Sequence, residues 1–182
     1  MYKVMLDTNV LIGFFLVYKK ENKEIHVIPK QLKKHQILLR LFESHTFDNV
    51  MTSWNRWELR EQIRDIWLQQ KYISEGYTTR EFTDAKQTIL LSDEDLNLIN
   101  QAVFDLWKFS IRENHEFSKK DIKIIENLTK KGYDFTDLLL IIQAKSFKCE
   151  FFITQDKKLK ELSKTFNLSI VSINEFLSKI QK

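Results

Sequence analysis

Short apolar runs alternate with longer, helically periodic segments at both ends of the chain. Four of the runs are rich in strand-forming residues, and they predict buried strands over residues 2–6, 47–51, 151–154 and 169–172. Apolar residues spaced three and four apart predict helices over residues 10–18, 54–70, 134–148, 157–166 and 174–180, and a further helix that contains residues 38–42. Strands that alternate with helices in this way are typical of parallel βαβ units. The pattern therefore predicts an α/β fold around a short, mostly parallel central sheet.

The middle of the chain has no comparable strand pattern. Residues 71 to about 132 predict further helices, one from Ser92 to Ile111 and one from Ser118 to Gly132, a residue type expected just past a helix C-terminus. Residues 19–34 are basic and polar, which predicts a loop or lid that runs into a helix. We expect residues 1–182 to form a single domain, with the helices of about 71–132 as an insertion or elaboration.

Composition and charge narrow the class of protein. A hydrophobic content of 43% with 30% charged residues excludes a disordered chain, and three Gly with one Pro are few for a β-sandwich or barrel. The net charge of +4 is compatible with a polyanionic partner. Cys149 is the single cysteine, so neither a disulfide framework nor a Cys-x-x-Cys metal site is expected. No membrane-spanning segment or signal peptide is recognisable, and we expect a cytoplasmic protein with no membrane partner.

Four carboxylates come from separate segments that the predicted topology brings to one edge of the sheet. Asp7 directly follows the first strand, and Asp156 follows the strand over residues 151–154. Asp137 lies in the first turn of the helix that leads into that strand, and Glu58 lies about one turn into the helix after the second strand. Open parallel sheets bind ligands beyond the carboxyl ends of their strands, so we expect these acids to line one cleft.

Electrostatics turn this convergence into a functional hint. Two carboxylates ~4 Å apart repel each other by about 4 kcal/mol at an effective dielectric of about 20, so four together would raise their pKa values or separate. A hard divalent cation removes the conflict, because Mg2+ and Mn2+ prefer oxygen ligands. The sequence has no His and Cys cluster that would compete for this role. We therefore predict Asp7, Glu58, Asp137 and Asp156 as catalytic, metal-binding residues.

Three of these acids also have a structural interpretation, as helix caps. Asp7 and Asp156 each stand directly before a predicted helix, where a side-chain oxygen would accept hydrogen bonds from backbone N–H groups. Asp134 and Asp137 form a D-x-x-D pair at a helix start, in which one residue can cap the helix while the other binds the metal. We expect Asp137 to be the ligand and Asp134 the cap, and the opposite assignment stays open.

The acids occur in four motifs that, in their order along the chain, resemble those of the PIN-domain nucleases. In that family an apolar strand ends in D-T/S-N, S-x4-E-L opens a helix, an Asp opens an amphipathic helix, and a last strand ends in T-x-D. The corresponding residues here are Leu6-Asp7-Thr8-Asn9, Ser53-x4-Glu58-Leu59, Thr136-Asp137-Leu138-Leu139 and Thr154-Gln155-Asp156. The second motif favours Glu58 over Glu61, which lies one turn further on. The resemblance spans nearly the whole chain.

The resemblance implies a three-layer α/β/α sandwich with extra central helices. It also implies an Mg2+- or Mn2+-dependent ribonuclease that hydrolyses phosphodiester bonds of single-stranded RNA and leaves 5′-phosphate and 3′-hydroxyl ends. Many small members of the family are VapC-like toxins, each neutralised by an antitoxin protein. Roughly eighty residues separate Glu58 from Asp137, more than in those compact toxins, so a toxin and an RNA-processing enzyme both stay open, as does a homodimer. The alternative function is a catalytically silent RNA- or protein-binding module.

Polar and basic neighbours of the acids complete the predicted site. The supporting residues are Thr8, Asn9, Asp134 and Thr154, of which Asn9 is expected to brace its loop. The residues predicted to contact RNA phosphates are Arg56, Lys157 and Lys158, which lie near the expected cleft. The basic run that holds Lys30, Lys33, Lys34 and His35 is expected to be a solvated helix face, and the four tryptophans are expected mainly in the core.

Overall fold

The computed structural model of the chain describes residues 1–21, 28–108, 110–113 and 115–180. Its centre is a five-stranded sheet in the order β3-β2-β1-β4-β5, and every neighbouring pair in it is parallel. The strands are β1 (Tyr2–Leu6), β2 (Phe47–Met51), β3 (Ser110–Arg112), β4 (Phe151–Ile153) and β5 (Ser169–Val171). The helices are α1 (Thr8–Glu21), the 3-10 helix η1 (Lys30–Leu32), α2 (Lys33–Glu43), α3 (Ser53–Ser74), α4 (Thr79–Ala85), α5 (Asp93–Trp107), α6 (Lys119–Thr129), α7 (Phe135–Ser146), α8 (Lys157–Lys160), α9 (Ser163–Phe166) and α10 (Ile173–Ile180).

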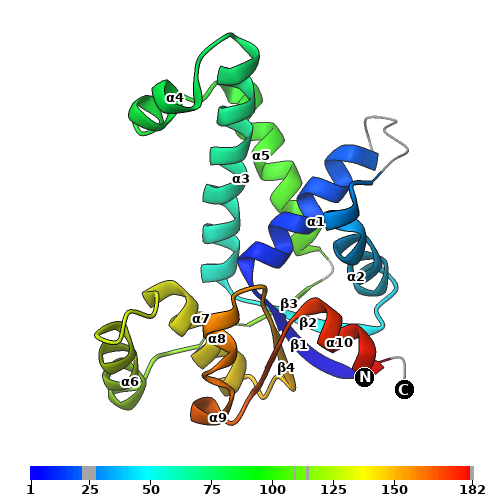
Figure 1. The fold of residues 1–182 in the computed structure, drawn as a ribbon, viewed down its shortest axis with the longest axis vertical. Coiled ribbons are helices and arrows are strands. Elements are labelled where there is room, and N and C mark those ends of the chain that lie inside the picture. Colours follow the sequence, from blue (N-terminus) through cyan, green and yellow to red (C-terminus); the bar gives the residue numbers. More distant parts are fainter. Residues whose placement is uncertain (22–27, 109, 114, 181–182) are drawn as a thin grey trace.

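Helices cover both faces of the sheet, which confirms the predicted α/β class and the three-layer α/β/α arrangement (Figure 1). Successive side chains of a strand point to opposite faces, so Val4 and Leu6 belong to one hydrophobic core and Met5 to the other. The first core packs the sheet against α1, α2, α3, α5 and α10, and the second packs it against α6, α7, α8 and α9. Because β1 is covered on both faces, its buried residues are apolar without alternation.

The sheet has a topological switch point between β1 and β4. From β1 the chain first adds β2 and β3 on one side, and it later adds β4 and β5 on the other. The helices that follow β1 and β4 leave these strands in different directions. Open parallel sheets bind ligands at the carboxyl ends of two such strands. Asp7 and Thr154 are the first residues past these two strands.

Helices α3, α4 and α5 form an arm that extends beyond the sheet. Figure 1 shows α3 and α5 side by side, with α4 at the far end of the arm. Asp95 on α5 is only 4% exposed, and its carboxylate accepts hydrogen bonds from Trp67 Nε1 (2.8 Å) and Lys71 Nζ (2.9 Å), both on α3. Ser92 Oγ, which caps α5, donates to the same carboxylate (2.7 Å). One buried acid thus joins the two long helices and the start of α5.

The prediction for residues 107–112 is wrong. Ile111 was expected at the end of a helix, but α5 ends at Trp107 and Ile111 lies in β3. A three-residue strand is too short for its sequence to show an alternating pattern. Its extended backbone depends instead on pairing with β2, where Asn49 Nδ2 also donates a hydrogen bond to Ser110 Oγ (2.9 Å). The central region therefore contributes a strand to the sheet as well as helices.

The basic segment over residues 19–34 differs in part from the predicted loop or lid. Helix α1 continues to Glu21, and η1 and α2 begin at Lys30 and Lys33, while residues 22–27 lie outside the described residues. The helices predicted around residues 54–70, 118–132, 134–148, 157–166 and 174–180 are confirmed, with the fourth divided into α8 and α9. Among the described residues, no helix combines the length and the apolar character needed to cross a lipid bilayer.

Removing the Asp95 carboxylate should loosen the arm. We expect Asp95→Ala to lower the free energy of unfolding at pH 7 by roughly 2–4 kcal/mol, because Trp67 Nε1 and Lys71 Nζ lose a buried charged acceptor. The same bonds hold the pKa of the Asp95 carboxyl below its usual range. The stabilisation is therefore fully present above about pH 4 and is lost as the pH falls toward the lowered pKa.

Urea denaturation at neutral and at acidic pH measures this effect. The control is Asp93→Ala, which removes an exposed acid from the first turn of the same helix. If the two substitutions changed the free energy of unfolding equally at pH 7, Asp95 would not hold the arm together.

Candidate active site

Asp7 lies between β1 and α1, and its carboxylate is almost completely enclosed, with the residue only 1% exposed. Its backbone N–H donates to Ile153 O (2.9 Å), and its Oδ2 accepts a hydrogen bond from Thr154 Oγ1 (2.6 Å). The Thr8 and Asn9 backbone N–H groups also bond to it, so Asp7 caps α1 as well. Burial outweighs these bonds and raises the pKa of Asp7.

A buried polar network fixes the start of α3 against β1 and α7. Thr52 and Asn55 form a capping box, in which each side chain accepts a hydrogen bond from the backbone N–H of the other. Asn55 is fully buried and donates from Nδ2 to Leu6 O at the end of β1 (3.5 Å). Thr52 Oγ1 donates to Gln143 Oε1 on α7 (2.8 Å). The network thus sets the relative position of three elements that carry acids.

Glu58 lies one turn into α3 and faces Asp7. Thr8 Oγ1 donates a hydrogen bond to Glu58 Oε2 (2.6 Å), so the residue that follows Asp7 holds the second acid in place. Burial raises the pKa of Glu58, and the negative charges of Asp7 and Asp134 raise it further. The structure therefore brings together the carboxylates that follow β1 and β2 in the sequence.

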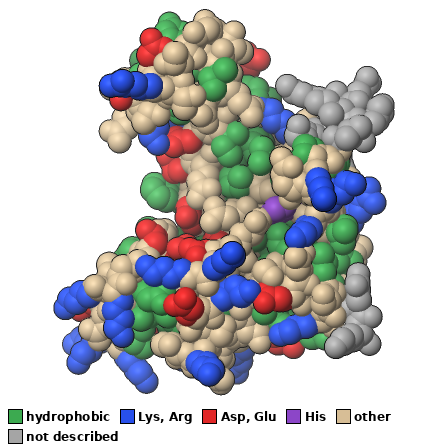
Figure 2. Space-filling model, in the orientation of Figure 1, with side chains coloured by type: hydrophobic (Ala, Val, Ile, Leu, Met, Phe, Trp, Pro, Cys, Tyr) green, Lys and Arg blue, Asp and Glu red, His purple; other side chains and the backbone are tan. Residues whose placement is uncertain are grey.

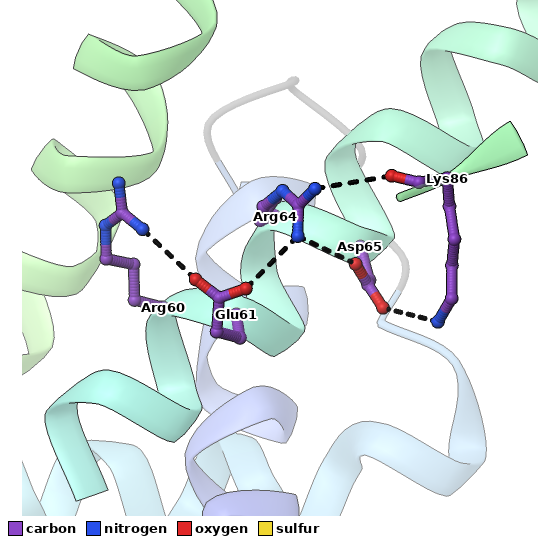
Figure 3. A network of polar contacts seen from close by, with 5 residues as sticks. All are labelled: Arg60, Glu61, Arg64, Asp65 and Lys86. Atoms are coloured by element: carbon purple, nitrogen blue, oxygen red, sulfur yellow. Dashed lines mark hydrogen bonds and ion pairs between the residues drawn. The ribbon is translucent and has the colours of Figure 1, made fainter. Parts of the chain in front are cut away.

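The neighbouring acid Glu61 points into a different environment. Figure 3 shows its carboxylate between two arginines of α3, at 3.1 Å from Arg60 Nη1 and 3.1 Å from Arg64 Nη1. Arg64 also approaches Asp65, which pairs with Lys86 past the end of α4 (2.9 Å). Glu61 thus belongs to an ion-pair network on the arm, and this separates it from Glu58.

Asp134 and Asp137 divide the two roles expected of their motif. Asp134 is the N-cap of α7, and its Oδ1 accepts hydrogen bonds from the Thr136 N–H (2.8 Å) and the Asp137 N–H (3.3 Å). A hydrogen bond from Thr136 Oγ1, together with these two backbone bonds, lowers the pKa of Asp134. Asp137 is half-buried, and its pKa is raised to about 7, first by burial and then by the negative charges of Asp7, Asp134, Glu58 and Asp156. The negative charge of each of these four acids therefore contributes to the pKa of Asp137.

Asp156 is exposed and caps α8. Its Oδ1 accepts a hydrogen bond from the Lys158 N–H (2.7 Å), and its own N–H donates to Thr154 Oγ1 (3.0 Å). Thr154 therefore contacts Asp7 and Asp156 through one hydroxyl group. The hydrogen bonds of Asp156 are therefore those of a helix cap. Its negative charge also contributes to the raised pKa of Asp137.

The basic residues predicted to contact RNA have different surroundings. Arg56 is exposed, and its guanidinium lies over the Trp107 ring, 5.3 Å from the ring centroid. Lys158 Nζ donates to Gly132 O and lies over the Tyr133 ring. Lys157 is exposed. Figure 2 shows that acidic side chains gather at the base of a notch between the arm and the α6–α8 region, with basic side chains beside them.

The donor chemistry of this acid cluster suits a hard divalent cation. Asp7, Glu58, Asp137 and Asp156 offer only carboxylate oxygens, the ligand type that Mg2+ and Mn2+ prefer, and a cation would replace their mutual repulsion by attraction. As they stand, however, no three or more His, Cys, Asp or Glu side chains of the described residues form a group that could hold a metal ion. Binding would therefore require the acid side chains to move closer together.

Sequence reasoning missed one buried residue near this site. His35 was expected on a solvated helix face, but it is only 6% exposed. The signal was present, because His35 precedes the buried residues Leu38, Leu39 and Phe42 by three, four and seven positions, which places all of them on one helix face. The basic residues around His35 give this segment the composition of a solvated helix face.

Comparison with known proteins adds no assignment to this geometry, since no protein-family model and no curated protein matches the chain. The functional argument therefore depends on the acids at the sheet edge and on the order of their motifs.

Asp137→Asn should stabilise the protein in the absence of divalent cations. Because the pKa of Asp137 is raised to about 7, its ionisation opposes folding, and the penalty grows as the pH rises from about 4 to about 7. In EDTA at about pH 8 we expect the substitution to raise the free energy of unfolding by roughly 1–3 kcal/mol, a range reduced for solvent screening, with little difference near pH 4.

The matched control is Asp134→Asn, measured by urea denaturation over the same pH range. Hydrogen bonds to Thr136 lower the pKa of Asp134, so its charged form stabilises the fold above about pH 4. Asp134→Asn should therefore be neutral or destabilising at about pH 8. If Asp137→Asn destabilised the protein under these conditions, the acids would not repel one another as described.

Proposed function

We propose that the protein is a metal-dependent ribonuclease that hydrolyses phosphodiester bonds of single-stranded RNA. The observation that carries the proposal is the raised pKa of Asp137, about 7, which burial and then the negative charges of acids that include Asp7, Glu58 and Asp156 produce near the carboxyl ends of β1 and β4. A purely structural role would not explain why a fold keeps acids that repel one another at a ligand-binding edge. The resemblance of the four motifs to those of PIN-domain nucleases supports the same activity.

In this proposal the four acids hold Mg2+ or Mn2+, and Thr8 and Thr154 keep Glu58 and Asp7 in position through their hydroxyl groups. When bound, the ion supplies an activated water and stabilises the charge that develops on the phosphoryl group. Asp134 fixes the first turn of α7 and thereby the position of Asp137. Because Asp137 must lose its proton to act as a ligand, metal affinity should rise with pH through the region around pH 7.

The second candidate is a catalytically silent module that binds RNA or protein. The observation in its favour is that no group of acids among the described residues is already arranged to hold a metal. Within the ribonuclease proposal, a cytoplasmic toxin controlled by an antitoxin protein and an RNA-processing enzyme are both consistent with the arm, which adds helices between Glu58 and Asp137. A homodimer belongs to the same set of proposals.

Cleavage of end-labelled single-stranded RNA in Mn2+ tests the activity. We expect products with 5′-phosphate and 3′-hydroxyl ends, no cleavage in EDTA, and a loss of at least about 100-fold in rate for Asp7→Asn, because the most buried ligand is replaced by a neutral amide. Glu61→Gln is the matched control, since it removes a nearby acid that pairs with arginines on the arm. Its rate should stay within about twofold of the wild type.

A thermal-unfolding series separates metal binding from catalysis. Mn2+ should raise the unfolding temperature of the wild type and of Glu61→Gln, and it should raise that of Asp7→Asn much less. Cleavage by Asp7→Asn at the wild-type rate would remove the central claim. If Mn2+ caused neither cleavage nor stabilisation of the folded wild type, the binding module would be the better description.

A further inference from the structure

A cavity lies beside the acid cluster, at the carboxyl ends of β4 and β5. Its volume is about 530 Å3. The side chains that line it include Lys30, Lys34, His35, Gln155, Ser172 and Asn174. They come from η1, from α2, from the turns that follow the two strands and from the first turn of α10. None of the acids of the cluster lines this cavity, although Gln155 stands between Thr154 and Asp156 in the sequence.

His35 is built into the wall of this cavity by a close approach of α1 and α2. A Cβ atom added at Gly13 of α1 would lie 2.0 Å from His35 Cδ2, so only glycine leaves room for the ring. Glycine inside a helix costs roughly 0.5–1 kcal/mol relative to alanine. Its presence in α1 is explained by the imidazole that packs against it, and this fixes the position of His35.

The two ring nitrogens of His35 connect the cavity to the turn after β4. Nε2 is hydrogen-bonded to the Gln155 side-chain amide, which holds Gln155 at the border between the cavity and the acid cluster. Nδ1 is buried and has no hydrogen bond of normal geometry within the described part of the chain. Burial lowers the pKa of the His35 ring, and the Gln31 backbone, which favours the protonated form, offsets this only in part.

The charge of the cavity is opposite to that of the acid cluster. Lys30 and Lys34 are exposed, and no carboxylate of the described residues lies within ion-pair distance of either ammonium group. Glu175, the acid nearest in sequence to Ser172, already accepts hydrogen bonds from the Ser172 N–H (2.6 Å) and from Lys160 Nζ (2.7 Å). Lys30 and Lys34 thus line the cavity together with neutral amide and hydroxyl groups. This combination suits an anion with several oxygen acceptors.

We propose that this cavity is a phosphate-binding subsite for the RNA strand whose scissile phosphate lies at the acid cluster. Lys30 and Lys34 neutralise the phosphate, Gln155 and Asn174 donate hydrogen bonds to it, and His35 acts as a positioning residue through its bond to Gln155. The inference rests on the proposed ribonuclease function for the identity of the ligand. It explains how a polyanion is held beside a group of carboxylates: the two lysines anchor the strand next to them.

Binding of RNA to the full-length Asp7→Asn protein tests the subsite without cleavage. Fluorescence anisotropy with a labelled single-stranded oligoribonucleotide should show at least about tenfold weaker binding when Lys30→Gln and Lys34→Gln are added. The slope of log K against log salt should become shallower by about 0.7, because the contact with one phosphate of the single strand is lost. The matched control is Lys123→Gln with Lys164→Gln, two exposed lysines of α6 and α9, which removes the same charge and should change binding much less. Equal losses in both double variants would overturn the proposal.

A second measurement distinguishes failure of the subsite from failure of the ribonuclease proposal. Inorganic phosphate titrated into the wild type should shift the NMR signals of the His35 ring, and the shift should disappear in the Lys30→Gln, Lys34→Gln variant but persist in the control variant. Such a response in a protein that never cleaves RNA would keep the anion subsite and refute the nuclease. Cleavage without any response of His35 to phosphate or of RNA affinity to the two lysines would keep the nuclease and refute the subsite.

Discussion

Burial of the Asp7 carboxylate is the constraint on which the rest of the site depends. A carboxylate taken out of water costs several kcal/mol unless hydrogen bonds and dipoles replace its hydration. Here the replacement comes from separate parts of the chain: Thr154 beyond β4 and the N–H groups of the first turn of α1. Each partner is tied to a further acid, since Thr154 also contacts the Asp156 N–H and Thr8 holds Glu58. Placing one buried charge therefore places the others.

The sequence was sufficient to predict the parts of this arrangement that follow from local pattern and topology. The strand over Tyr2–Leu6 was predictable because β1 is covered on both faces and so carries a continuous apolar run. The position of Asp7 directly past that strand, together with parallel connectivity, was enough to expect it near Asp156. The choice between Asp134 and Asp137 needed the structure, because both residues lie in the first turn of one helix and only the side-chain contacts distinguish a cap from a free carboxylate.

Features that depend on contacts between distant segments could not be predicted from the sequence. The strand β3 exists because β2 offers it a partner, and its three residues carry no pattern of their own. The link from Thr52, the cap of α3, to Gln143 on α7 joins residues 91 positions apart, and no local pattern pairs them. The burial of His35 could be predicted only in part. Its helical spacing indicated burial, whereas the space for its ring is provided by Gly13 on another helix. Local patterns thus predicted the elements, and long-range packing decided their contacts.

The charge of the candidate site is opposite in sign to the net charge of the chain. The chain as a whole carries a net charge of +4, yet carboxylates lie at the edge of the sheet, where burial and then their mutual repulsion raise the pKa of Asp137 to about 7. A nucleic acid strand is attracted by the first property and repelled by the second, so it can approach the acids only if a cation neutralises them or basic groups hold the strand nearby. The cavity of Lys30 and Lys34 provides such groups, and Gln155, bonded to His35, separates it from Asp156 by a single residue position. In the proposed ribonuclease, opposite charges on the two sides of one short turn would let an acidic centre bind an acidic polymer.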